Sequence, residues 1–156
     1  MILLPEYTVP IGLAIVIALL LGAGLSTQAG VNSSLRTALG HPLHATIFNF
    51  VVGLVLVFAT ALAIGLRTPS AEHFQRSSPW MYLGGVLGAI YVLGSTALAP
   101  RLGAATLMGL IVTGQLVAAT IIDHNGWLGF EAHPATGTRL VGGLLLIVGV
   151  VLIRRG

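Results

Sequence analysis

The chain has 156 residues, of which 56% are hydrophobic and only 7% are charged, and its mean hydropathy is +1.00. A soluble domain carries about 25% charged residues, so this composition leaves too little polar surface to face water. The seven basic residues, all Arg, give a net charge of +3 and are too dispersed for a nucleic-acid-binding patch. The sequence contains no Cys, which excludes a disulfide framework and a thiolate metal site.

Charged residues interrupt the chain at intervals that suit membrane spans. Four uncharged runs of 29, 30, 24 and 21 residues clear the length of about 20 residues that a helix needs to cross the hydrocarbon core. A fifth run has only 14 residues and reaches spanning length if its helix begins near Pro134. The sequence therefore predicts an all-α membrane protein with one integral membrane domain over residues 1–156. Its helices are expected at about 10–35, 42–66, 79–99, 101–123 and 135–154.

Proline, glycine and polar residues set the expected helix boundaries. Pro10 suits the first helical turn of the first span, and Gly40-His41-Pro42 predicts a tight turn before the second. Residues 67–78 form the first polar segment and are expected to be a loop. Pro100 predicts a sharp stop to the third span. Because the N-terminus lacks the basic region of a secretory signal, the first helix is expected to stay in the mature protein.

Five spans place the two termini on opposite sides of the membrane. Four Arg (36, 101, 154 and 155) then lie on one side and three (67, 76 and 139) on the other. The positive-inside rule barely orients such a chain. Two interpretations remain open: a single topology with the N-terminus outside, or insertion in both orientations followed by antiparallel pairing.

Polar side chains at membrane depth fall on helical faces. An amide that faces lipid without a partner costs several kcal/mol, so these faces are expected to turn inward. Each residue taken alone suits an interhelical contact, but the set favours a solute cavity placed off-centre in one chain. Thr96 belongs to the same polar cluster. The predicted substrate-binding residues are Gln28, Asn32, Asn49, Tyr91, Ser95 and Gln115.

Four glycines are predicted to mediate close helix packing. Gly84 and Gly88 have GxxxG spacing, which lets helix backbones approach one another. Gly142 and Gly149 lie on one face of the last span. These glycines are expected to permit helix sliding or a close dimer contact.

No catalytic or metal-binding pattern is visible in the sequence. No Asp, Glu, Lys or Arg lies deep in a span, and the His spacing matches no metal motif. We therefore expect no enzyme activity, no cofactor and no metal site. The carboxylates Glu6, Glu72, Asp123 and Glu131 are all expected at helix ends or in loops. Proton relays use carboxylates buried in the membrane. Because none is expected there, we expect transport to depend little on pH between about pH 6 and 8.

Several segments together resemble the YdcZ-like branch of the drug/metabolite transporter superfamily. The more specific ones are Pro79-Trp-Met-Tyr-Leu-Gly-Gly-Val-Leu-Gly-Ala-Ile-Tyr91, Gly114-Gln115 and Asp123-His-Asn-Gly126. Others are Gln28-Ala-Gly-Val-Asn32, Asn49-Phe-Val-Val-Gly53, Ala99-Pro-Arg-Leu-Gly-Ala-Ala-Thr106 and Arg139-Leu-Val-Gly-Gly143. The resemblance covers nearly the whole chain.

This resemblance implies five helices per unit and an antiparallel homodimer that forms a ten-helix bundle of two inverted halves. It also implies a place in the inner membrane. The small multidrug-resistance relatives carry a membrane-embedded Glu in the first helix. This chain has none there, so their cation exchange chemistry is not transferred to it.

The first functional interpretation is a small inner-membrane transporter that acts as an antiparallel dimer by alternating access. Its substrate is expected to be a small neutral or zwitterionic polar solute, because amides offer both donors and acceptors. Two alternatives remain: a passive dimeric channel, and an accessory membrane subunit without transport of its own. The expected partners are membrane lipid and a second copy of the chain. No binding to nucleic acid is expected.

Overall fold

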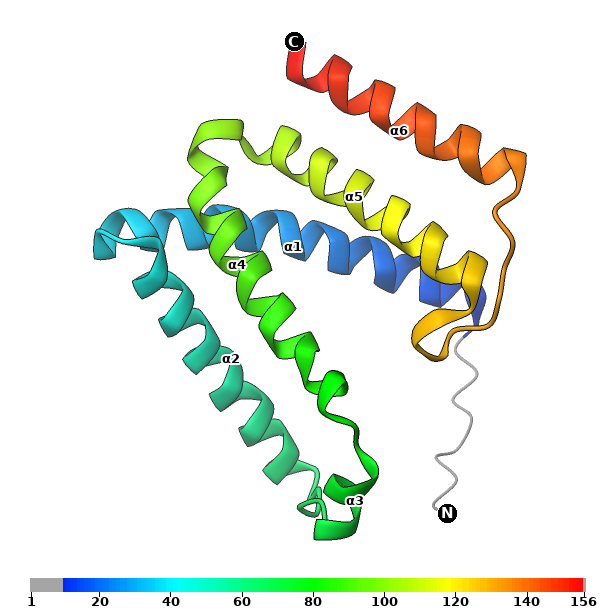
Figure 1. The fold of residues 1–156 in the computed structure, drawn as a ribbon. Coiled ribbons are helices and arrows are strands. Elements are labelled where there is room, and N and C mark those ends of the chain that lie inside the picture. The colour runs from blue at the N-terminus through cyan, green and yellow to red at the C-terminus, as the bar shows by residue number, and fades with distance from the viewer. Residues whose placement is uncertain (1–9, 156) are drawn as a thin grey trace.

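The computed structural model describes residues 10–155, and within that range the chain is helical without any strand (Figure 1). Five of its helical segments are long and apolar enough to cross a membrane. They are α1 (Ile11–Leu39), α2 (Pro42–Ala63), α4 (Leu83–Leu102) with its preceding 3-10 turn η1 (Pro79–Tyr82), α5 (Ala104–Asn125) and α6 (Gly137–Arg155). The all-helical prediction with five candidate spans is confirmed. At 1.5 Å per residue, the 19 residues of α6 measure about 28 Å, close to the thickness of a hydrocarbon core.

The predicted stop at Pro100 is wrong. Helix α4 continues through Pro100 to Leu102 and ends at Gly103, whose φ of 74° interrupts the helical path. A proline in the last turn of a helix removes only one backbone hydrogen bond, so the helix can continue for two residues beyond it. Gly103 tolerates the positive φ because it has no Cβ, and α5 begins at the next residue.

The other helix ends differ from the predicted ones by a few residues. Helix α1 runs beyond Arg36 to Leu39, because it is the positive φ of Gly40 (76°) that ends the helix. Arg36 is in the last turn, from which its long side chain can reach the membrane–water interface. Pro42 then starts α2, where the His41 ring accepts a hydrogen bond from the Leu43 amide at 3.1 Å. The polar segment expected to be a loop contains the short helix α3 (Ala71–Arg76), and the 3-10 turn η2 (Trp127–Gly129) follows α5.

The buried residues concentrate at one end of the bundle, which we call the tight end. There α1 and α4 end, α2 and α5 begin, and α6 ends. Helices α1, α2 and α4 all contact one another, and α5 contacts α1 and α4 as well. Most of the buried residues are small or polar: Ala29, Asn32, Ala45, Thr46, Ser95, Thr96 and Thr106. The larger apolar Leu107 and Val150 are buried with them. Small side chains let the helices approach closely where no lipid intervenes.

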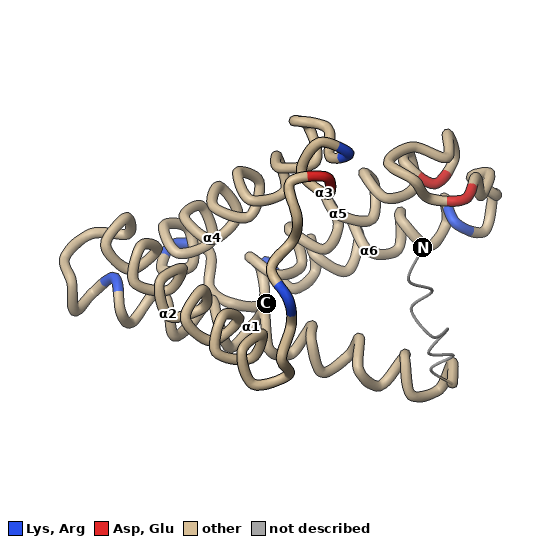
Figure 2. Tube along the Cα trace, turned by 90° about the horizontal axis from the view of Figure 1, so that it is seen from below, with Lys and Arg blue, Asp and Glu red and all other residues tan. Residues whose placement is uncertain are grey.

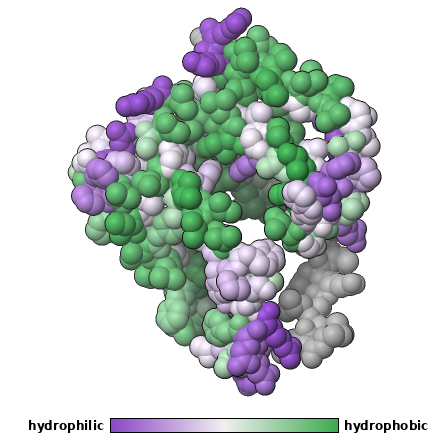
Figure 3. Space-filling view, in the orientation of Figure 1, coloured by the Kyte–Doolittle hydropathy of each residue, from purple (hydrophilic) through white to green (hydrophobic). Residues whose placement is uncertain are grey.

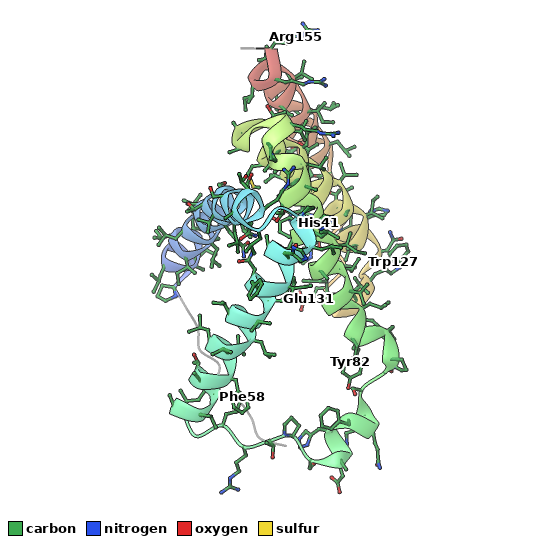
Figure 4. The ribbon with its side chains drawn as sticks, turned by 90° about the vertical axis from the view of Figure 1, so that its left-hand side faces the viewer. His41, Phe58, Tyr82, Trp127, Glu131 and Arg155 are labelled. Atoms are coloured by element: carbon green, nitrogen blue, oxygen red, sulfur yellow. The ribbon has the colours of Figure 1, made fainter. Side chains whose placement is uncertain are left out.

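The opposite end, which we call the open end, has little buried surface. Helices α2 and α4 diverge toward the segment that joins them (Figure 4). In that view Phe58 lies in the second half of α2, and Tyr82 lies at the start of α4. Large apolar side chains stay exposed along every span, among them Leu54, Leu87 and Leu145 at 65–68%. Hydrophobic residues cover most of the visible face of the molecule (Figure 3). Lipid or another protein chain must cover that surface.

Helix α6 lies beside α5 at the edge of the bundle (Figure 1). Within the described residues it packs against α5 and no other helix. The closest approach is at Gly109, where an added Cβ would lie 2.7 Å from Cγ2 of the buried Val150. Only glycine fits at this point without movement of the neighbouring side chain.

Candidate functional site: an amide-lined groove between three helices

A groove of about 410 Å³ lies between α1, α2 and α4. Two of the predicted substrate-binding residues, Gln28 on α1 and Asn49 on α2, line it together. Apolar side chains and one glycine form the rest of its wall, and they are Phe50, Gly53, Leu54, Val57 and Val92. From Asn49 the groove follows α2 toward the open end. Its chemistry is that of an uncharged, largely apolar surface with two carboxamides.

An amide pair marks the end of this groove nearest the buried layer. The side-chain nitrogen of Asn49 donates to the side-chain oxygen of Asn32 over 2.7 Å, which joins α2 to α1. Asn32 is only 2% exposed, whereas Asn49 is half-buried and also lines the groove. The contact therefore holds two helices together, as the packing interpretation expects. It uses one donor and one acceptor, and each carboxamide keeps further hydrogen-bonding capacity.

The remaining predicted site residues are distributed over α4 and α5. Ser95 is buried, and its hydroxyl donates to the carbonyl of Val92 in its own helix at 3.1 Å. Tyr91 is half-buried on the same helix. Gln115 lies exposed on α5 and does not line the groove between α1, α2 and α4. One chain thus brings Gln28, Asn32 and Asn49 together, and a role for Tyr91, Ser95 and Gln115 in solute binding stays a prediction.

None of the four glycines predicted to mediate packing meets a neighbour within the chain. A Cβ added at Gly84, Gly88, Gly142 or Gly149 would have nothing within 4 Å. Their predicted packing role therefore stays a prediction about a contact outside this chain. The close contact inside the chain, at Gly109 and Val150, was missed. Helical spacing does not show which face of α5 meets α6, so neither residue was predicted.

Within residues 10–155 the charged residues lie in the turns and in the first or last turns of helices, while Glu6 lies outside the described residues (Figure 2). At the open end, Arg139 donates to the Asp123 carboxylate and to the His133 carbonyl, both at 3.4 Å. The His133 amide donates to the Asp123 carbonyl at 2.7 Å, so the segment after α5 folds back onto its end. Both partners of the ion pair are partly exposed, at 42% and 32%, and its contribution to stability is therefore small.

No cluster of three or more His, Asp or Glu side chains suited to a metal ion occurs in residues 10–155. The imidazoles instead bind nearby backbone groups. His41 caps α2, and His124 accepts the Ala135 amide at 3.2 Å. These side chains therefore have structural contacts at the helix ends.

Five apolar helices, three of which line an uncharged groove with two carboxamides, define a multi-pass membrane protein. The profile of the family described as "Putative inner membrane exporter, YdcZ" matches residues 13–152. The chain is also 26% identical to the Inner membrane protein YdcZ of Escherichia coli (strain K12) over 134 residues, which make up 86% of this chain and 89% of that protein. No solved structure shows a significant match. The chain belongs to the YdcZ-like branch of the drug/metabolite transporter superfamily and is an inner-membrane protein.

Proposed function

We propose that this protein exports a small neutral or zwitterionic polar solute, by alternating access and as an antiparallel homodimer. The observation that carries the proposal is the groove between α1, α2 and α4, where Gln28 and Asn49 face an otherwise apolar wall. Polar side chains at membrane depth are costly unless they have partners or a task. The exposed Gln28 has no hydrogen bond within the described residues and is free to bind a solute.

The homodimer is supported by surface that one chain leaves uncovered. In each span, at most 11% of the residues in the apolar window are buried, so most of the span's surface is left for lipid or a partner chain. The predicted packing glycines face open space. A second copy offers a complementary surface, because an inverted orientation sets its tight end beside the open end of the first copy. The four-to-three distribution of Arg permits both orientations.

Alternating access is supported by the difference between the two ends. A site at the interface of inverted repeats becomes accessible from either side when one repeat rocks against the other. In the proposed dimer, the two tight ends lie on opposite membrane sides, and each can close one side of the shared site. The groove that begins at the Asn32–Asn49 pair supplies a solute surface between them.

A ligand screen on purified protein tests this function. Common amino acids, polyols and small amides serve as probes, and a ligand that binds only the folded state raises the melting temperature. Gln28→Ala is expected to abolish the shift of any ligand found and to leave the melting temperature of the unliganded protein nearly unchanged. Thr27→Ala is the matched control, because Thr27 is an exposed neighbour whose hydroxyl donates to its own helix at the Ala23 carbonyl.

Transport of the same ligand into and out of liposomes then separates the alternatives. Saturable flux that Gln28→Ala removes supports a transporter. Linear and very fast flux would indicate a passive channel instead. Absence of both binding and flux for every probe would contradict the proposal and favour an accessory membrane subunit.

A further inference from the structure

Two grooves lie along the contact between α5 and α6 at the open end. The larger one, of about 430 Å³, has a mostly apolar wall and extends from Arg139 to Ile147 on α6. The smaller one, of about 310 Å³, reaches the side chain of Asp123 on α5. Leu116, Thr120 and Arg139 line both grooves, so the two spaces adjoin at these residues. An ion pair therefore lies where two open grooves meet.

The depth of the larger groove suits one leaflet of a membrane. Ile147 follows Arg139 by eight positions, which corresponds to about 12 Å along a helix. Half of a hydrocarbon core measures about 15 Å. The connection between α5 and α6 exposes Trp127 and Phe130, and such aromatic side chains lie at the level of the lipid headgroups. Arg139 thus lies near the headgroups, and the apolar wall lies at the depth of acyl chains.

The two charges are placed against the helix dipoles. Arg139 is in the first turn of α6, where the free amides already favour an anion. Asp123 is in the last turn of α5, where the free carbonyls already favour a cation. Each charge therefore disfavours its own helix. Together they concentrate positive potential at the start of α6 and negative potential at the end of α5, which a ligand with adjacent anionic and cationic groups complements.

The ion pair retains hydrogen-bonding capacity for such a ligand. Within residues 10–155, Arg139 uses only Nη1 for its two side-chain hydrogen bonds, both at 3.4 Å. Its Nε and Nη2 remain available, and a guanidinium binds phosphate through such paired N–H groups. The carboxylate of Asp123 accepts the Arg139 bond through Oδ2, and its other oxygen can accept from an ammonium.

We propose that the grooves between α5 and α6 bind a zwitterionic phospholipid with a primary ammonium, as in phosphatidylethanolamine. Its phosphate binds Arg139, its ammonium binds Asp123, and one acyl chain lies along the wall of the larger groove. The apolar side chains of that wall include Val117, Ile121, Leu140, Leu144 and Ile147. An anionic headgroup would face the Asp123 carboxylate without a compensating cation, and a choline headgroup has no ammonium hydrogen to donate.

This lipid site is separate from the proposed solute site. It shares no lining residue with the groove between α1, α2 and α4, and it does not depend on transport activity. Because the lipid contacts both α5 and α6, it would fasten α6 to the bundle. Helix α6 packs only against α5 within the described residues, so bound lipid is expected to stabilise the fold measurably.

The test is the melting temperature of the delipidated full chain in detergent, with dioleoyl phosphatidylethanolamine, phosphatidylcholine or phosphatidylglycerol added. Phosphatidylethanolamine at about ten times its Kd is expected to raise it by about 3–6 °C. The other two lipids are expected to give smaller shifts at the same concentration. Equal shifts with all three lipids, or no shift, would overturn the proposal and leave non-specific lipid or a second copy of the chain as the cover of these grooves.

Variants of the ion pair separate headgroup recognition from stability. Asp123→Asn removes the partner of the ammonium and leaves Arg139 without its carboxylate, so the preference should change to phosphatidylglycerol. Arg139→Gln should reduce the shift with every phospholipid. Arg76→Gln is the matched control, because it removes the same charge from a residue that lines neither groove. A preference for phosphatidylethanolamine that survives Asp123→Asn would contradict the assignment.

Gly143→Val tests the acyl-chain groove without changing a charge. Gly143 lines the larger groove, and a Cβ added there has nothing within 4 Å, so the valine side chain occupies groove space. The apparent Kd for phosphatidylethanolamine should weaken about tenfold. Gly114→Val is the control, since Gly114 is equally open and lines neither groove. Equal affinities of the two variants would show that the acyl chain does not occupy this groove.

Discussion

The two ends of this bundle differ in how their helices are held. At the tight end, small and polar residues such as Ala29, Ala45 and Thr96 are buried, and a side-chain hydrogen bond crosses from α2 to α1. At the open end, α2 and α4 diverge, and the connection between α5 and α6 is held by partly exposed contacts around Asp123 and Arg139. One chain thus completes the packing of only one end. The open end leaves apolar surface uncovered. In the proposed function, a second copy of the chain covers this surface and the solute binds in the groove that leads toward it.

The largest expected effect is at Gly109, where α5 and α6 are in close contact. Gly109→Ala places a Cβ 2.7 Å from Cγ2 of Val150, so either the Val150 side chain or α6 must shift. Overpacking of this kind costs about 1–3 kcal/mol. Gly114→Ala is the matched control on the same helix, since nothing lies within 4 Å of its Cβ. Thermal unfolding in detergent measures both, and equal melting temperatures for the two variants would refute the close contact.

The amide pair is expected to give the next largest effect. Asn49→Ala leaves the Asn32 oxygen buried without its donor, and such a loss costs about 1–3 kcal/mol. A double-mutant cycle with Asn32→Ala should give a coupling of about 0.6–1.7 kcal/mol, the range for hydrogen bonds between membrane helices. Coupling near zero would mean that the two amides do not hold α1 and α2 together.

Gly88 offers a way to separate the packing of one chain from that of the dimer. A Cβ added at Gly88 has no neighbour within 4 Å, so the folded monomer should tolerate Gly88→Leu. If a partner approaches at this face, the bulky side chain should shift the protein from dimer to monomer on gel filtration. An unchanged dimer would place Gly88 toward lipid and remove it from the predicted packing residues.

The smallest effect is expected for the ion pair at the open end. Asp123→Asn removes a contact between partly exposed groups, and such pairs contribute about 0–1 kcal/mol. Solute transport into liposomes should persist in this variant and change little between about pH 6 and 8. Uphill transport that is driven by a pH gradient and disappears in Asp123→Asn would instead make that carboxylate the coupling group.

The sequence predicted the membrane spans well, because their apolar length is a local property. The charge-free runs located all five candidate spans, and the order of the helices placed Asn32 and Ser95 near one end. The helix ends were less predictable. They depend on the backbone geometry at Gly40 and Gly103, where a positive φ ends α1 and α4.

The candidate site could be predicted only in part, since it depends on how helices rotate against each other. Helical spacing placed Gln28 and Asn49 on polar faces, and both residues line the groove. Spacing could not show that Asn49 also bonds Asn32, or that Gly109 rather than Gly142 meets a neighbouring helix. The unpaired state of the Thr96 hydroxyl likewise follows from three-dimensional packing.

Site-specific labelling in intact cells tests most directly whether this chain pairs with an inverted copy of itself. The protein has no native Cys, so Ala38→Cys at the tight end and Gln75→Cys at the open end can each be labelled alone with a membrane-impermeant reagent. Insertion in both orientations predicts that about half of each variant reacts from outside. Complete labelling of one position and none of the other would show a single orientation and contradict the antiparallel homodimer.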